Sequence, residues 1–244
     1  MPPTPINVIR PRVCWWIAAS MAVDGAMYAI FYHQGQCCEA GTRLLLHNSI
    51  ADEFIHTLVE KTKKIKVGDP MQMTTDMGPL VSQKQYDRVM SYIDVAKEQG
   101  STVLTGGKAP SDAALAAGYY VEPTVVTAKP EDRVCQEEVF GPFVTVTRFT
   151  DEDEVIRMAN STDYGLGGGL WTEGLQRAHR VARAMRSGMV WINTYKRVNP
   201  GSPFGGVGQS GYGREMGFEA MHEYTDAKSV WVNVDANLPP YYPR

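Results

Sequence analysis

Short apolar runs alternate with helix-periodic segments along most of this chain, and that alternation limits the fold more than any other feature of the sequence. The strand-like runs cover residues 44–47, 102–105, 143–149, 167–171 and 189–192. In the segments between them, such as 82–99 and 172–186, apolar side chains recur every three or four residues. Because strands that alternate with helices build parallel sheets, we expect an α/β fold: a layered domain with a largely parallel sheet flanked by helices.

Three hydroxyl side chains mark expected helix starts. Ser49 with Asp52, and Ser82 with Gln85, fit the reciprocal pattern in which each side chain caps a free amide of the first turn. Thr150 is placed to cap a short helix that runs to residue 160. We therefore expect helices to begin directly after these residues.

Composition and length exclude several classes of protein. The chain has 244 residues, enough for one large domain or two small ones, and its 43% hydrophobic and 21% charged content is typical of a globular protein. A formal net charge of −3 gives no basic surface for nucleic acid. No apolar run approaches the roughly 20 residues of a membrane helix. We therefore expect neither a nucleic-acid partner nor a membrane.

Four cysteines indicate a reducing environment. Their spacing fits neither a zinc finger nor a disulfide scaffold; they are Cys14, Cys37, Cys38 and Cys135. We therefore expect a cytoplasmic protein with no metal site. The run 13–19 follows Arg10 and Arg12 and is faintly similar to a signal peptide, but it is short and broken, which argues against export.

The two ends of the chain are set apart from the rest. Residues 1–21 form an atypical N-terminal segment, and residues 225–244 form a strand with a Pro-Pro tail. In the expected strand 228–234, Val230, Val232 and Val234 share one face. This strand either extends its own sheet or pairs with another chain, and its place after the last helix favours the second.

Two adjacent cysteines stand in the stretch 31–43, directly after the apolar helical segment 22–31. Gly35 allows a sharp turn, and Ala40 and Gly41 leave room for a ligand near the sulfur atoms. A thiol attacks as thiolate, so a catalytic cysteine needs donors or a cation that lower its pKa. Composition alone favours the simpler interpretation, in which Cys37 and Cys38 are ordinary buried apolar residues.

Three further motifs follow. Glu-Glu-Val-Phe-Gly-Pro occupies residues 137–142, and by itself it reads as a charged turn before a strand. Asn-x-x-x-Tyr-Gly-Leu occupies 160–166. Residues 202–215, which begin Ser-Pro-Phe-Gly-Gly and end Gly-Arg-Glu, contain enough glycine to form a loop that folds back on itself. They lack the strand–turn–helix context of a dinucleotide fingerprint.

Together with Phe-x-x-x-Gly-Gln-x-Cys at 31–38, these motifs resemble the aldehyde dehydrogenase superfamily, in its order and spacing, from about residue 22 onward. The resemblance is to the C-terminal catalytic portion, here 22–224. It implies that Cys38 is the nucleophile, that Glu138 accepts hydrogen bonds from the nicotinamide ribose of NAD or NADP, and that Phe140 packs near the nicotinamide ring.

The same resemblance implies a substrate pocket for a small aldehyde, bordered by Phe31, Cys37 and Phe204. It also implies self-association into a homodimer or higher oligomer through the strand 228–234. Lys196 and Arg197 precede the glycine-rich loop, where they could favour an anionic aldehyde, although solvation at the surface is the commoner role.

Two departures from the family affect the expected activity. Glu39 follows the nucleophile where the family has a small or apolar residue, and a carboxylate that faced the sulfur would raise the thiol pKa. Family members are also longer: their preceding half carries the dinucleotide-binding fold and a Glu-Leu-Gly-Gly motif with the general base, which is absent from residues 1–244. We expect an aldehyde dehydrogenase-type oxidoreductase that is weak or inactive alone. The alternatives are a catalytically silent binding or oligomerisation module and a cysteine-dependent esterase remnant.

Overall fold

A computed structural model describes the backbone of residues 6–9 and 15–234 and the side chains from residue 21 to residue 234. Strands from both halves of the chain form one sheet in the order β3-β4-β5-β2-β1-β6-β7. The strands are β1 (Ile6–Ile9), β2 (Arg43–His47), β3 (Val103–Thr105), β4 (Thr124–Thr127), β5 (Phe143–Phe149), β6 (Gly167–Trp171) and β7 (Met189–Ile192). Only β3 and β4 pair antiparallel within the described sheet. The expected α/β fold with a largely parallel sheet is confirmed.

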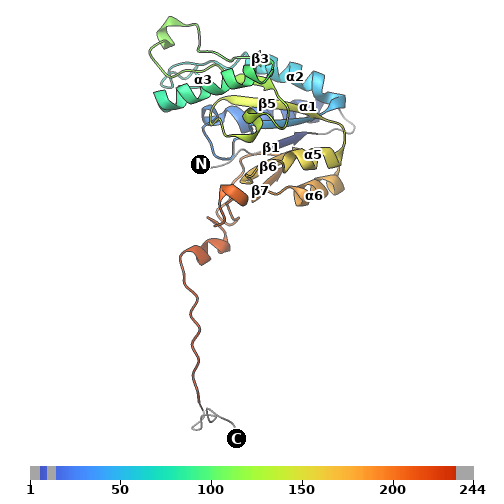
Figure 1. The fold of residues 1–244 in the computed structure, drawn as a ribbon, viewed down its shortest axis with the longest axis vertical. Coiled ribbons are helices and arrows are strands. Elements are labelled where there is room, and N and C mark those ends of the chain that lie inside the picture. The colour runs from blue at the N-terminus through green and yellow to red at the C-terminus, as the bar shows by residue number, and fades with distance from the viewer. Residues whose placement is uncertain (1–5, 10–14, 235–244) are drawn as a thin grey trace.

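Helices cover both faces of this sheet (Figure 1). They are α1 (Trp15–Phe31), α2 (Asn48–Thr62), α3 (Gln83–Glu98), α4 (Arg133–Gln136), α5 (Glu152–Ala159) and α6 (Leu175–Ala184). The side chains of β2 divide the core: Leu44 and Leu46 pack with α1 and α2, whereas Leu45 packs with α5 and α6 on the opposite face. The period of two along a strand explains this division, and α3 shares a third cluster with β4 and β5.

Two central features were missed by the sequence analysis. Residues 6–9, within the segment set apart as atypical, form β1 between β2 and β6 in the middle of the sheet. Strand β4 also lacked a prediction. The helix expected over 22–31 begins earlier, at Trp15. Both missed strands have only four residues and contain polar side chains, as Ile-Asn-Val-Ile and Thr-Val-Val-Thr, so neither forms a continuous apolar run.

The helix starts were predicted with mixed success. Ser82 caps α3 as expected, because its hydroxyl accepts a hydrogen bond from the Gln85 amide at 3.3 Å, whereas the Gln85 side chain donates to the carbonyls of Val139 and Phe140. The predictions for Ser49 and Thr150 were wrong. The imidazole of His47 accepts from the Ser49 amide and caps α2, and the carboxylate of Asp151 caps α5.

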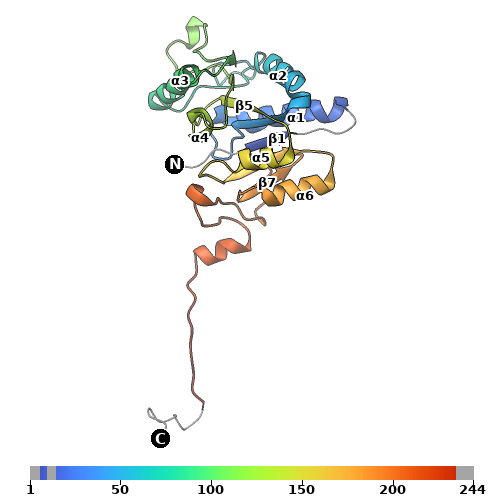
Figure 2. The same ribbon diagram turned by 45° about the vertical axis from the view of Figure 1, so that its right-hand side comes forward.

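The end of the described chain runs away from the sheet as an extended arm (Figures 1 and 2). Residues 225–234 pair with no strand among the described residues, and the Trp231 side chain is 93% exposed. The segment expected to be a strand therefore does not extend its own sheet here. None of the helices in the described part of the chain has the length and apolarity needed to cross a membrane.

Candidate active site

The loop that carries the cysteines is shaped by left-handed backbone and by close contact with a second motif. After α1, His33, Gln34 and Gly35 have φ values of 54°, 58° and 67°. A Cβ atom added to Gly35 would lie 2.0 Å from the carbonyl oxygen of Gly141. Only glycine fits both the backbone conformation and this contact. The cysteine loop is therefore seated directly on the 137–142 motif.

Both thiols donate hydrogen bonds to the same carboxylate. The Sγ atom of Cys37 lies 3.0 and 3.1 Å from the two carboxylate oxygens of Glu39, and the Sγ atom of Cys38 lies 3.3 Å from Oε2. The two cysteines are half-buried and free, while Glu39 is buried. The sequence left open whether Glu39 faces the sulfur atoms, and the structure shows that its carboxylate faces both.

This arrangement holds both thiols in the neutral form. Burial raises the pKa of Cys38 to about 12, with further contributions from its hydrogen bond to Glu39 and from the charge of Glu39. Burial and the same carboxylate raise the pKa of Cys37. Burial alone would raise the pKa of Glu39, but the hydrogen bonds from Cys37 and Cys38 outweigh it and lower that pKa. Glu39 is therefore ionised at neutral pH and the thiols are not.

The segment after β7 brings Tyr195 and Lys196 close to Glu39 and Cys37. Burial and the charges of Glu39 and Cys37 raise the pKa of the Tyr195 hydroxyl well above its usual value. The positive charge of Lys196 lowers the pKa of both Cys37 and Glu39. The Lys196 ammonium lies 5.0 Å from the centre of the Tyr32 ring, and its Nζ atom is buried. The expectation that Lys196 is a solvated surface residue is therefore wrong. Arg197, for which the same role was expected, is exposed.

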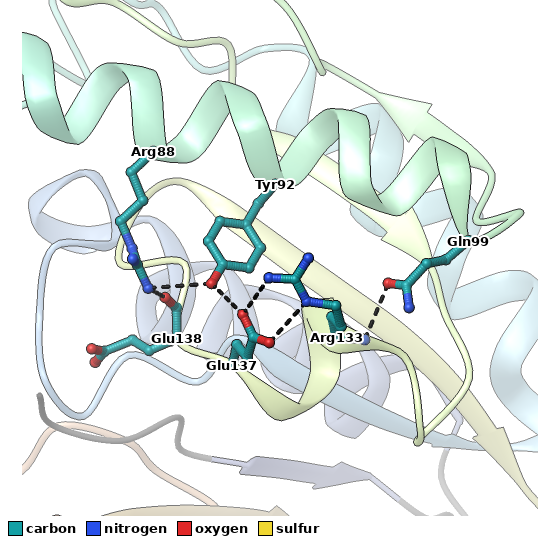
Figure 3. Close-up of polar contacts among 6 residues, drawn as sticks. All are labelled: Arg88, Tyr92, Gln99, Arg133, Glu137 and Glu138. Atoms are coloured by element: carbon teal, nitrogen blue, oxygen red, sulfur yellow. Dashed lines mark hydrogen bonds and ion pairs between the residues drawn. The ribbon is translucent and has the colours of Figure 1, made fainter.

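A network of hydrogen bonds fixes the 137–142 motif to α3 (Figure 3). Arg133 makes a two-pronged ion pair with the Glu137 carboxylate at 2.8 and 2.9 Å, and the Tyr92 hydroxyl donates to the same carboxylate at 2.7 Å. Arg88 donates to the backbone carbonyl of Glu138. Glu137 is thus held in place by its partners, and the sequence did not predict Arg88, Tyr92 or Arg133 in this role.

The neighbouring carboxylate of Glu138 points away from this network (Figure 3). Burial raises the pKa of Glu138 to about 7, and the nearby positive charge of Arg88 opposes that rise. The next aromatic residue, Phe140, has a φ of 58°, and its carbonyl accepts a hydrogen bond from the Gln85 side chain at 2.7 Å. The two residues expected at the cofactor therefore stand on one rigid turn, which Gly35 contacts.

The two phenylalanines expected at the substrate pocket lie in different settings. Phe31 is buried in the core cluster that also contains Trp191 and Tyr195. Phe204 is half-buried and pairs with Glu215 through two backbone hydrogen bonds of 2.7 Å. The structure thus brings Phe31 and the cysteine loop together along one continuous segment, whereas the backbone partner of Phe204 lies within the glycine-rich loop itself.

Comparisons with known proteins point to one family. The model of the aldehyde dehydrogenase family matches residues 18–230. A betaine aldehyde dehydrogenase from Brucella anthropi is 43% identical over 90% of this chain and 45% of its own length. An aldehyde dehydrogenase from Emericella nidulans is 45% identical over 86% of this chain and 41% of its own length.

Solved structures agree in fold. The structure of PnpE from a Pseudomonas species superimposes with a TM-score of 0.92 at 61% identity, over 98% of this chain and 48% of that one. PnpE in complex with nicotinamide adenine dinucleotide gives a TM-score of 0.94 at 60% identity, over 100% of this chain and 49% of that one. The chain thus spans about half the length of the relatives it matches.

Proposed function

This chain belongs to the aldehyde dehydrogenase family, and on that premise we propose that it carries the nucleophile and part of the cofactor site of an NAD(P)-dependent aldehyde oxidation. The observation that carries the proposal is the contact between Gly35 and Gly141, because it seats the cysteine loop on the turn that holds Glu138 and Phe140. A thiol and a ribose-binding carboxylate have to be close neighbours for aldehyde oxidation to occur between them.

In the proposed reaction, the Cys38 sulfur adds to the aldehyde carbon and forms a thiohemiacetal. NAD(P) supplies the hydride acceptor when it is bound. Loss of the hydride from the carbon leaves a thioester on Cys38, and water hydrolyses that thioester to the carboxylic acid. Cys37 lies beside the nucleophile, and with Phe31 and Phe204 it borders the proposed substrate pocket.

The residues on the 137–142 turn fit the proposed cofactor. Glu138 is half-buried, and its carboxylate extends away from the hydrogen-bond network that holds Glu137 (Figure 3). A carboxylate with its acceptor sites uncommitted is suited to receive hydrogen bonds from two ribose hydroxyls. Phe140 follows on the same turn, from which its ring can pack near the nicotinamide.

We propose that the chain alone is weak or inactive. Glu39 holds both thiols neutral, and a neutral thiol is a poor nucleophile. The chain also spans about half of its relatives, so the hydride acceptor would meet only part of a site. A catalytically silent binding or oligomerisation module is therefore the second candidate, and an esterase that transfers acyl groups to Cys38 is the third.

We further propose that residues 228–234 join this chain to a second copy or to a longer relative. The segment is extended, and its large apolar side chains are exposed: Val230, Trp231, Val232 and Val234. A strand with unpaired backbone groups can add to the sheet of another chain. The free thiols of Cys37, Cys38 and Cys135 favour a reducing, cytoplasmic location.

Several of the relatives are named betaine aldehyde dehydrogenase, but we do not propose betaine aldehyde as the substrate of this chain. It carries a quaternary ammonium group. The ammonium of Lys196 would repel that group, whereas the ionised carboxylate of Glu39 would attract it, so the charges near the thiols do not assign betaine aldehyde to this chain.

The test separates the candidates by their products. The purified chain is incubated with p-nitrophenyl acetate, and the acylated residue is located by mass spectrometry. In parallel, NADH or NADPH formation is followed with several aldehydes at high protein concentration. We expect slow formation of NADH or NADPH that is lost in Cys38→Ala. Acylation of Cys38 with no reduction of cofactor would favour the esterase, and the absence of both products would favour the silent module. Acylation that persists in Cys38→Ala would disprove the role of that residue as nucleophile.

A further inference from the structure

Two buried hydrogen-bond donors next to the thiols have no acceptor in the described part of the chain. They are the hydroxyl of Tyr195 and the Nζ atom of Lys196. Buried polar groups in folded proteins are nearly always paired, so a buried donor without an acceptor among the described residues points to a partner beyond them. A buried ammonium is the more demanding of the two, because an unpaired charge costs more to bury than a neutral hydroxyl.

Backbone and ring contacts hold these donors in place. Lys196 has a φ of 56°, a left-handed conformation that is unfavourable for a lysine. Its ammonium is directed over the Tyr32 ring at 5.0 Å, at the end of the helix that leads into the cysteine loop. The Tyr195 ring packs against Trp171, with centroids 6.1 Å apart, and against Trp191, at 4.6 Å. Strained backbone of this kind is typical of functional sites.

The nearest carboxylate does not satisfy the donors. Both oxygens of Glu39 accept hydrogen bonds from the thiols of Cys37 and Cys38. The Glu39 side chain starts beside β6, where its Cβ atom would lie 3.6 Å from a Cβ atom added to Gly167. The charges of Glu39 and Cys37 both act on Tyr195, so the donors and the thiols share one neighbourhood in which the described residues supply no acceptor.

We infer that the Tyr195 hydroxyl and the Lys196 ammonium bind an anionic group, such as a carboxylate, carried by the aldehyde that Cys38 attacks. The inference rests on the proposed function, since it names the chemical class of that substrate. A carboxylate accepts a charge-assisted hydrogen bond from lysine and a second hydrogen bond from tyrosine. The hydroxyl of Tyr195 stays protonated and is available as a donor, because burial raises its pKa.

The test measures binding without chemistry. The whole chain with Cys37→Ser and Cys38→Ser, in which the loop has no sulfur left to add to an aldehyde, is titrated with succinate semialdehyde and with the methyl ester of that compound. Saturation-transfer NMR gives the two dissociation constants. We expect the acid to bind about tenfold more tightly than the ester, the difference that one charged hydrogen bond provides. Reduction of NAD(P) plays no part, so a failed dehydrogenase assay does not affect this result.

Variants in the same background identify the residues responsible. Lys196→Met should remove the preference for the acid, whereas Lys196→Arg, which keeps the charge, should retain most of it. Tyr195→Phe should weaken binding of the acid severalfold. Lys64→Met serves as the matched control on an exposed lysine of the surface. Circular dichroism melting verifies that each variant is folded.

Three results would overturn the inference. Equal binding of acid and ester would show that Lys196 finds its partner within the chain, for example in Glu39. A preference that survives in Lys196→Met would place the anion elsewhere. Absence of binding by either ligand would mean that the two donors form no site in this chain.

Discussion

Replacement of Glu39 by glutamine should make Cys38 more reactive, because the wild-type Glu39 carboxylate stabilises the protonated form of the Cys38 thiol. Burial, the Glu39 hydrogen bond and the Glu39 charge together raise the pKa of Cys38 from 9.0 to about 12. At pH 7 the thiolate fraction falls from about 1 in 100 to about 1 in 100,000 over that range, since each pKa unit is a factor of ten.

Glutamine removes the charge but leaves the burial, which is the larger cause. We therefore expect only part of the roughly thousandfold difference to return, an increase of about tenfold or more in the rate of alkylation at neutral pH. The direction follows from the thiol equilibrium: the reactive form is the thiolate, and a lower pKa raises its population at every pH below that pKa.

The assay is alkylation by iodoacetamide, with peptide fragmentation between Cys37 and Cys38 to assign the modified sulfur. The wild-type rate should climb about tenfold per pH unit beyond pH 9, whereas the rate for Glu39→Gln should level off at a lower pH. Glu53→Gln, on an exposed face of α2, is the matched control. A Glu39→Gln variant that reacts no faster than wild type at neutral pH would refute the reasoning.

The remaining predictions concern stability and assembly. Burial raises the pKa of Glu138 from 4.5 to about 7, so its contribution to stability is complete below pH 4.5 and is lost as the pH rises through about 7. Glu138→Gln should therefore lose less stability than wild type between those pH values in urea melts, and parallel curves would contradict the pKa. Gly35→Ala should lower the melting temperature more than Gly100→Ala. Both glycines have positive φ, which costs an alanine about 1–2 kcal/mol, but only the alanine at position 35 places a Cβ 2.0 Å from a carbonyl oxygen. Equal melting temperatures would mean that the loop is not seated as described. Trp231→Glu should shift the chain toward monomer in sedimentation experiments, and an unchanged oligomeric state would argue against pairing through 228–234.

Most of the sheet could be predicted locally, and its exceptions have a common cause. The runs 143–149, 167–171 and 189–192 match β5, β6 and β7 as observed, because each is a bounded apolar segment of a length typical of strands. β1 and β4 were missed because each is short and is interrupted or bounded by polar residues, as Ile-Asn-Val-Ile and Thr-Val-Val-Thr, whereas the equally short β7 is entirely apolar. The central position of β1 depends on pairing with β2 and β6, which lie far from it in sequence.

For the candidate site, the sequence motifs identified individual residues but gave neither their contacts nor their protonation states. Cys38, Glu138 and Phe140 were singled out from short patterns, and their catalytic and cofactor roles stay predictions. Arg88, Tyr92 and Arg133, which hold the 137–142 motif, carry no local signal, since an arginine on a helix is usually a solvated surface residue.

The sequence by itself determined the alternation of strands and helices, the family, and the glycine that the cysteine loop requires, because each depends on neighbours along the chain. Only the tertiary structure decided that Glu39 faces both thiols and that Lys196 and Tyr195 find no acceptor among the described residues. Those properties depend on the direction of each side chain and on how much water reaches it. Hydrogen bonding and burial fix the protonation of the thiols, and both arise only when β6, β7 and the cysteine loop pack together.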